Sequence, residues 1–251
     1  MSVSVPELKA ADRLAILNSS QISMFLRSPE IDEQWYSSAA RLAEICQIED
    51  AATRGVNIGD RRALFYLVRA LLPTSILEIG SHVGASTLYI AAAMPYGSTL
   101  ATIDIREVNN APDAYWRTAG LRRSPMQMLI EFDADLHVDF VVSDSVAYLR
   151  NTKRLFDFIF LDGDHAMETV LSEVAMSLNV LNKEGIIVLH DYFPEGKPIW
   201  PGRAAISGPF NAVEKLRAAG APLKVVSLGE LPWETKLGSR LTSLGLLVGK
   251  R

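Results

Sequence analysis

The sequence Ser75-Ile-Leu-Glu78-Ile-Gly80-Ser81-His82-Val-Gly84-Ala-Ser86 joins a short apolar run to a helix-like segment through two glycines. The apolar run at residues 75–79 predicts a buried β-strand. The glycines permit a tight turn, and they let a ligand approach the backbone before the helix begins. The stretch therefore predicts the first strand, turn and helix of an α/β domain, with the turn as a candidate binding site.

The same alternation of short apolar runs and helix-like segments continues along the chain, which is typical of a mostly parallel sheet. The final two runs are separated only by a polar loop containing Pro232 and Gly238, so we expect them to pair antiparallel. The predicted fold class is α/β, a Rossmann-like seven-stranded sheet with helices on both faces and an antiparallel C-terminal strand pair. The expected strands are residues 75–79, 99–105, 139–142, 156–161, 185–189, 223–228 and 241–248.

The N-terminal part of the chain shows apolar residues at helical spacing and lacks β-type runs. We expect residues 1–60 to form a helical extension, which either caps the cofactor or makes a homodimer contact. Residues 61–251 form the main domain. The first helix of that domain is predicted to start after Asp60 as N-cap and to end at Pro73.

Composition excludes several functional classes. The chain has 251 residues, 22% of them charged, and a net charge of −4, so no positive field attracts a nucleic acid. No uninterrupted apolar stretch approaches the roughly 18 to 20 residues of a membrane span, so no membrane partner is expected. The single cysteine, Cys46, cannot form an internal disulfide, which fits a cytoplasmic location.

The residues that close the second and third expected strands suggest an adenosine-type ligand. Ligands of open α/β sheets lie beyond the carboxyl ends of the strands. Asp104 closes the second strand, where it can accept hydrogen bonds from both ribose hydroxyls or can simply cap its loop. Ser143-Asp144-Ser145 closes the third and offers an acceptor for an adenine amino group. Together with the glycine turn, these strand ends predict a nucleoside pocket.

A second polar group follows the fourth and fifth strands. Asp162-Gly-Asp164-His165 follows one, and His190-Asp191 follows the other. Because these strands are expected to be neighbours, the two groups should converge beside the nucleoside pocket. The alternative is that both aspartates cap their loops and that the histidine makes a supporting hydrogen bond.

The glycine turn resembles the E-x-G-x-x-x-G-x-S motif of S-adenosylmethionine-dependent O-methyltransferases of the catechol and caffeoyl-CoA type. It lacks the closer glycine spacing of dinucleotide-binding proteins. The resemblance implies that the turn holds the methionine part of the cofactor, that the second strand end holds the ribose and that the third holds the adenine. The predicted cofactor-binding residues are Glu78, Gly80, Ser81, His82, Gly84, Ser86, Asp104, Asp144, Ser145 and Asp162.

The LDGDH and HDY segments resemble the strand ends of metal-dependent O-methyltransferases, including those that act on sugars. The resemblance implies that Asp162 and Asp191 hold magnesium. The position of His190 is usually acidic in the sugar enzymes, so this histidine is a nitrogen ligand, a base or a sign of weakened metal binding. The catalytic base is either Asp164 or His165, and we favour His165 because histidine titrates near neutral pH.

The sequence thus predicts a cytoplasmic S-adenosylmethionine-dependent O-methyltransferase assisted by a divalent metal, most plausibly Mg²⁺. The expected acceptor is a small molecule, a sugar or a phenolic secondary metabolite. A first alternative is an NAD(P)-dependent oxidoreductase, which the glycine spacing and the lack of a Tyr-x-x-x-Lys sequence disfavour. A second alternative is a non-enzymatic protein that binds S-adenosylmethionine.

Overall fold

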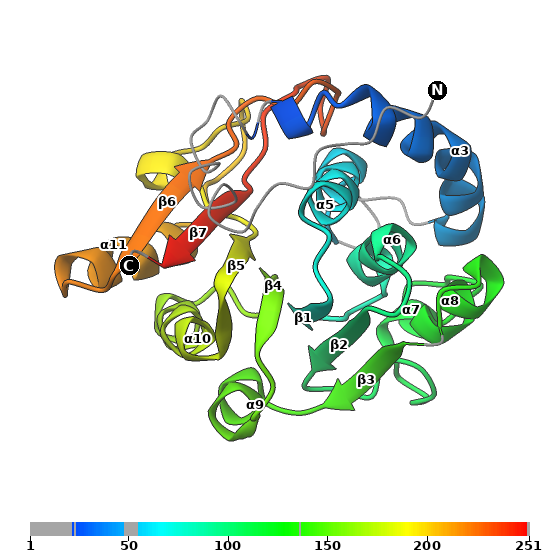
Figure 1. Ribbon diagram of the computed structural model, residues 1–251, viewed down its shortest axis with the longest axis horizontal. Helices are drawn as coiled ribbons and strands as arrows, with labels where there is room; N and C mark the ends of the chain where they lie inside the picture. Colours follow the sequence, from blue (N-terminus) through cyan, green and yellow to red (C-terminus); the bar gives the residue numbers. More distant parts are fainter. Residues whose placement is uncertain (1–21, 23, 48–54, 136, 250–251) are drawn as a thin grey trace.

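The computed structural model describes residue 22 and residues 24–47, 55–135 and 137–249 (Figure 1). Its centre is a seven-stranded sheet in the order β3-β2-β1-β4-β5-β7-β6. The first five strands pair in parallel, and β7 pairs antiparallel with both β5 and β6. The strands are β1 (Ser75–Ile79), β2 (Thr99–Asp104), β3 (Val138–Val142), β4 (Phe156–Leu161), β5 (Leu181–Leu189), β6 (Leu223–Ser227) and β7 (Gly245–Gly249).

Helices cover both faces of this sheet, so the predicted Rossmann-like fold is confirmed. Figure 1 shows α5 and α6 on one face and α9 and α10 on the other. Helix α11 packs beside α10. The helices are α3 (Pro29–Cys46), α5 (Ile58–Leu71), α6 (Ala85–Ala93), α7 (Tyr115–Thr118), α8 (Pro125–Phe132), α9 (Ser145–Asn151), α10 (Met167–Val180) and α11 (Gly208–Ala218), with a short 3-10 turn η1 (Pro194–Gly196).

The starts of β5 and β7 differ most from the sequence prediction, because pairing and side-chain contacts decide them. Strand β5 begins at Leu181 and not at residue 185, since Leu181 pairs with Phe156 ahead of the apolar run. Strand β7 begins at Gly245 and not at residue 241. Before it, the side chains of Thr242 and Ser243 donate hydrogen bonds to buried aspartates, and these two residues lie outside the strand.

The start of α5 also differs from the prediction. Asn57 is the N-cap, and its side-chain oxygen accepts a 3.0 Å hydrogen bond from the backbone N–H of Asp60. Asp60 therefore lies inside the first turn and is fully buried. Its carboxylate accepts hydrogen bonds from the side chains of Asn57 and Thr242, so it joins the start of α5 to the segment before β7. The predicted domain boundary at residue 60 falls within this helix.

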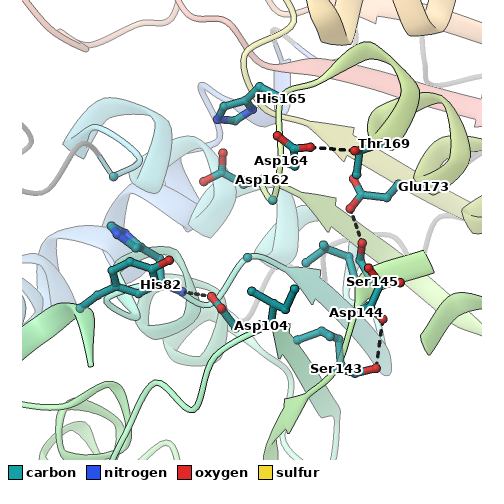
Figure 2. Close-up of a pocket in the computed structure, with 17 residues that line it drawn as sticks. His82, Asp104, Ser143, Asp144, Ser145, Asp162, Asp164, His165, Thr169 and Glu173 are labelled. Carbon is teal, nitrogen blue, oxygen red and sulfur yellow. Dashed lines mark hydrogen bonds between the residues drawn. The ribbon is translucent and has the colours of Figure 1, made fainter. Parts of the chain in front are cut away.

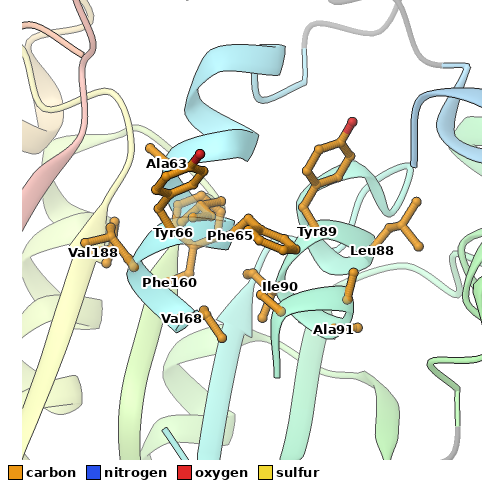
Figure 3. Close-up of a cluster of buried hydrophobic side chains, with 14 of the residues drawn as sticks. Ala63, Phe65, Tyr66, Val68, Leu88, Tyr89, Ile90, Ala91, Phe160 and Val188 are labelled. Carbon is orange, nitrogen blue, oxygen red and sulfur yellow. The ribbon is translucent and has the colours of Figure 1, made fainter. Parts of the chain in front are cut away.

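The apolar core on the α5 and α6 face is shown in Figure 3. Phe65 and Tyr66 of α5 and Leu88 of α6 are fully buried together with Phe160 of β4 and Val188 of β5. Burying one such side chain stabilises the fold by roughly 1.5–3 kcal/mol. This packing holds the carboxyl ends of β1, β4 and β5 in fixed positions relative to one another.

Helix α3, which belongs to the predicted N-terminal extension, packs against α5, α6 and α8. Its Trp35 ring lies 5.4 Å from the Phe65 ring and 6.0 Å from the Tyr89 ring, measured between centroids. Helix α3 therefore covers part of one helical layer of the main domain, and both the cofactor cap and the homodimer contact stay predictions. None of the helices in the described part of the chain is long and apolar enough to cross a bilayer.

Candidate active site

The turn after β1 is held against the end of β4 by a close backbone approach. Gly80 has a φ of +98°, and a Cβ atom at this position would lie 2.2 Å from the backbone oxygen of Asp162. Any side chain at residue 80 would push the two strand ends apart. Gly84, with a φ of +78°, then forms the N-cap of α6. Both predicted glycine positions are thus explained by the backbone conformation that they adopt.

Glu78 stabilises this turn through buried hydrogen bonds. Its carboxylate is fully buried and accepts hydrogen bonds from Ser86 (2.6 Å), Thr87 (2.6 Å) and Thr102 (2.7 Å). Burial raises the pKa of Glu78 to about 7. Ser81 joins the same network through a 2.6 Å hydrogen bond between its hydroxyl and that of Thr102. These side chains tie the turn to α6 and β2, and they lie behind the pocket.

Asp104 at the end of β2 both fixes the turn and faces the pocket. Its Oδ2 accepts a 2.9 Å hydrogen bond from the backbone N–H of His82, and its Oδ1 accepts a 3.0 Å hydrogen bond from that of Arg106. His82 has a φ of +47°, and its ring lies 4.4 Å from the ring of Tyr115. Burial lowers the pKa of His82. Asp104 therefore caps its loop and also lines the pocket, and its contact with a ribose stays a prediction.

A pocket of about 540 Å³ opens at the carboxyl ends of the parallel strands (Figure 2). Glu78, Ser81, Gly84 and Ser86 do not line it, and neither do His190 and Asp191. The predicted site residues that line the pocket are Gly80, His82, Asp104, Asp144, Ser145, Asp162, Asp164 and His165. The strand ends predicted to bind the cofactor and those predicted to carry the chemistry therefore share one cavity.

The end of the pocket near β3 carries a buried acid that sequence reasoning missed. Asp144 is the N-cap of α9, and its Oδ1 accepts a 2.8 Å hydrogen bond from the backbone N–H of Ala147. The hydroxyl of Ser145 donates a 2.6 Å hydrogen bond to Glu173 of α10. Burial raises the pKa of Glu173 to about 7. Its only sequence signal is an acidic residue on the inward face of a helix, which is too common to single out.

Two further lining residues lacked a usable signal in the sequence. Ile105 follows Asp104 and is 70% exposed, so it presents an apolar surface to the pocket. Tyr115 at the start of α7 closes the side next to His82. Aromatic and aliphatic residues in connecting segments usually serve packing, which is why their position had to come from the fold.

The other end of the pocket carries the two candidate bases. Asp164 accepts hydrogen bonds from the hydroxyl of Thr169 (2.7 Å) and from the backbone N–H of Ala166 (3.2 Å). The hydrogen bond from Thr169 is the main reason that the pKa of Asp164 is lowered. His165 lies beside it, with its Nε2 atom 3.5 Å from Oδ2 of Asp191. The fold thus pairs a pocket-lining histidine with a largely buried carboxylate.

His190 lies behind this pair and is surrounded by carboxylates. Its Nδ1 lies 2.8 Å from Oδ1 of Asp162 and 3.7 Å from Oδ1 of Asp191, and its Nε2 lies 3.5 Å from Oδ2 of Asp60. Burial by itself lowers the pKa of His190. The carboxylates of Asp162 and Asp191 outweigh that effect and raise the pKa well above its ordinary value.

Part of the chain that forms this site matches a known protein family. Residues 77–192, which span β1 to the end of β5, match the model of a methyltransferase domain. This part of the chain is thus similar to a methyltransferase domain. The match includes the glycine turn, both aspartate strand ends and the HDY segment, so the predicted resemblance to class I S-adenosylmethionine-dependent O-methyltransferases is confirmed.

Relatives with a recorded activity share part of the chain. A rhamnosyl O-methyltransferase of Mycobacterium tuberculosis is 26% identical over 149 residues, which cover 59% of this chain and 57% of that protein. The matched region therefore spans less than two thirds of the relative.

Solved structures show the same fold over most of the chain. The O-methyltransferase TomG from Streptomyces achromogenes, solved with S-adenosylmethionine, has a TM-score of 0.61 and 20% identity, covering 88% of this chain and 96% of its own. An O-methyltransferase from Bacillus cereus, solved with S-adenosylhomocysteine, has a TM-score of 0.61 and 20% identity, with 88% and 97% covered. At these identities the likeness shows the fold alone.

The magnesium site that the resemblance implies does not fit the residues found here. Histidine binds a cation through a nitrogen that carries no proton, and magnesium prefers oxygen ligands. Both ring nitrogens of His190 instead face carboxylates. Within residues 24–47, 55–135 and 137–249, no group of three or more His, Cys, Asp or Glu side chains is arranged to hold a metal ion. We therefore derive no reaction step through a metal.

Proposed function

We propose that this protein transfers the methyl group of S-adenosylmethionine to a hydroxyl group of a small molecule. The observation that carries the proposal is the single pocket shared by Asp104 and Asp162, because it offers a nucleoside site and a proton acceptor side by side. Figure 2 shows Asp104, Ser143 and Asp144 towards one end of this pocket and Asp164 and His165 towards the other.

The cofactor is proposed to lie along the ends of β1, β2 and β3. The carboxylate of Asp104 is held by two backbone N–H groups, so it is oriented to accept hydrogen bonds from the ribose hydroxyls. Ile105 offers the apolar surface for one face of the adenine, and the strand end at Asp144 and Ser145 supplies polar partners at its edge. The backbone of the turn from Gly80 to His82 faces the methionine part.

His165 is the base that the geometry favours. Methyl transfer is an in-line displacement, in which the acceptor oxygen attacks the methyl carbon as the carbon–sulfur bond breaks. The hydroxyl proton passes to Nδ1 of His165, since Nε2 faces Asp191. The products are a methyl ether and S-adenosylhomocysteine. Asp164 is the weaker candidate, because the hydrogen bond from Thr169 lowers its pKa and so its basicity.

A sugar is the acceptor class that we propose. The acceptor end of the pocket is lined by the carboxylates of Asp162 and Asp164, which accept hydrogen bonds from neighbouring hydroxyls and repel an anionic acceptor. The partial match to rhamnosyl O-methyltransferases supports the same class. A phenol offers fewer hydroxyls to these carboxylates and is the second choice.

Calorimetry and a methyl-transfer assay test the proposal. We expect S-adenosylhomocysteine to bind with one site per chain and NAD⁺ to give no heat. With radiolabelled S-adenosylmethionine, rhamnosides with free hydroxyls should be labelled, and their fully O-methylated counterparts should not. Binding of NAD⁺ in place of S-adenosylhomocysteine would reject the proposed cofactor. Cofactor binding without labelling across sugar and phenol panels would instead support a non-enzymatic role.

A further inference from the structure

One buried histidine lies at the centre of three carboxylates that come from different parts of the chain. The ring of His190, at the end of β5, contacts Asp162 from the end of β4, Asp191 beside it and Asp60 from α5. The His190 side chain is 9% exposed, and those of the three aspartates are 15%, 11% and 0% exposed. Carboxylates held this close in a dry environment repel one another unless a group between them offsets the repulsion.

A divalent cation would need the position that the His190 ring fills. Such an ion binds oxygen ligands on several sides at about 2.1 Å, so it must lie among the carboxylates. Nδ1 of His190 already lies 2.8 Å from Asp162. On the other side of the ring, Asp60 faces Nε2 and is itself held by Asn57 and Thr242. Carboxylates therefore lie on both sides of the ring, and the ring and the ion exclude each other.

We propose that the side chain of His190 replaces a divalent cation in this protein, so that methyl transfer proceeds without a metal ion. His190 is a positioning residue in this arrangement, because it does not line the pocket and acts through the carboxylates that it contacts. It keeps Asp162 directed towards the pocket and Asp191 directed towards His165. This inference rests on the proposed function for its catalytic part, whereas its metal-binding part stands without it.

The buried position of Asp60 supports the same interpretation. An acid in the first turn of α5 has no solvent contact and lies far from β5 in the sequence. Its contact with Nε2 gives His190 a carboxylate on each ring nitrogen, which is an ion-pair arrangement. A fixed side chain of this kind holds the neighbouring carboxylates in place without recruiting an ion from solution.

The test compares metal binding by the wild-type protein with that of two variants at one position. Manganese binding is measured by calorimetry on chelator-treated protein without acceptor. We expect no binding to the wild type and none to His190→Asn. His190→Asp vacates the ring position and adds an oxygen ligand, so it should bind Mn²⁺ at least about tenfold more tightly than His190→Asn.

Turnover provides the second measurement. Wild-type activity should be unchanged by chelation, whereas any activity of His190→Asp should depend on added Mn²⁺. The inference is overturned if the wild type binds one Mn²⁺ per chain, or if chelation abolishes its turnover and Mn²⁺ restores it. S-adenosylhomocysteine binding checks that each variant is folded. The wild-type metal measurement decides the matter even if His190→Asp does not fold, and it does so whether or not the proposed acceptor is correct.

Discussion

Nε2 of His165 lies 3.5 Å from Oδ2 of Asp191, and Ser243 donates a 3.2 Å hydrogen bond to the other oxygen of the same carboxylate. Asp191 has a φ of +52°, in the left-handed region that aspartate enters more readily than most residues. The segment before β7 thus holds an acid that in turn orients a pocket-lining histidine. This chain of contacts joins the C-terminal strand pair to the proposed chemistry.

The first prediction concerns this pair. His165→Gln should lower kcat by about 10²–10⁴-fold, because the acceptor loses its base. Asp191→Asn should lower kcat about tenfold or more and leave the KM for S-adenosylmethionine nearly unchanged, since Asp191 acts by orienting the base. Steady-state kinetics with the sugar acceptor measures both.

His137→Gln, at an exposed histidine outside the pocket, is the control and should behave as wild type. Normal turnover in His165→Gln would move the role of base to Asp164.

The second prediction concerns the proposed ribose contact. Asp104→Asn should weaken S-adenosylhomocysteine binding by about 10- to 100-fold, because a charged acceptor of two hydroxyl groups is lost. Calorimetry gives the dissociation constant directly. Asp139→Asn provides the matched control, since Asp139 is an exposed aspartate on the neighbouring strand β3 and lies outside the pocket. Equal affinities for the two variants would place the ribose elsewhere.

The third prediction separates close backbone approach from backbone strain. Gly80→Ala and Gly97→Ala both place a side chain at a positive φ, +98° and +80° respectively. Only the first Cβ meets the Asp162 carbonyl, whereas the second meets nothing within 4 Å. The free energy of unfolding of both variants should fall by about 1 kcal/mol because of backbone strain. Gly80→Ala should in addition lose S-adenosylhomocysteine binding, as measured by thermal shift with and without ligand. Retained ligand binding in Gly80→Ala would show that the strand ends can separate without loss of the site.

The fourth prediction follows from the buried carboxyl of Glu78, whose pKa is raised from 4.5 to about 7. The folded state holds this proton more tightly than the unfolded state. The resulting stability is fully present below pH 4.5 and is lost as the pH rises towards about 7. The loss should be on the order of 3 kcal/mol, since the pKa rises from 4.5 to about 7 and one pKa unit corresponds to about 1.4 kcal/mol.

Urea unfolding of the wild type and of Glu78→Gln between pH 5 and pH 8 measures this effect, over a range set by the shift of Glu78 from 4.5 to about 7. The variant cannot ionise, so its stability should fall less steeply with pH than that of the wild type. Glu173 titrates in the same range and contributes equally to both proteins, so the difference between the two curves isolates Glu78. Parallel curves would mean that Glu78 is ionised throughout.

Much of the fold could be predicted because its signals are local. Strands β1 and β4 lie at the predicted residues, since short apolar runs bounded by turn residues are buried on both faces of a parallel sheet. The start of β7 and the N-cap of α5 were mispredicted. The start of β7 depends on a partner that is distant in sequence, since Thr242 donates its hydrogen bond to Asp60. The N-cap of α5 depends on a local choice between two capping residues, Asn57 and Asp60, only three positions apart.

The amino-acid sequence alone predicted a nucleoside pocket, because a glycine turn and acidic strand ends form a pattern along the chain that parallel strands must bring to one edge of the sheet. Only the tertiary structure decided which of these residues face the pocket and which support it. In it, Glu78 and Ser86 lie behind the turn, His165 lies beside Asp191, and His190 lies among three carboxylates. Those relationships depend on contacts between segments far apart in the chain, and local patterns contain no information about such contacts.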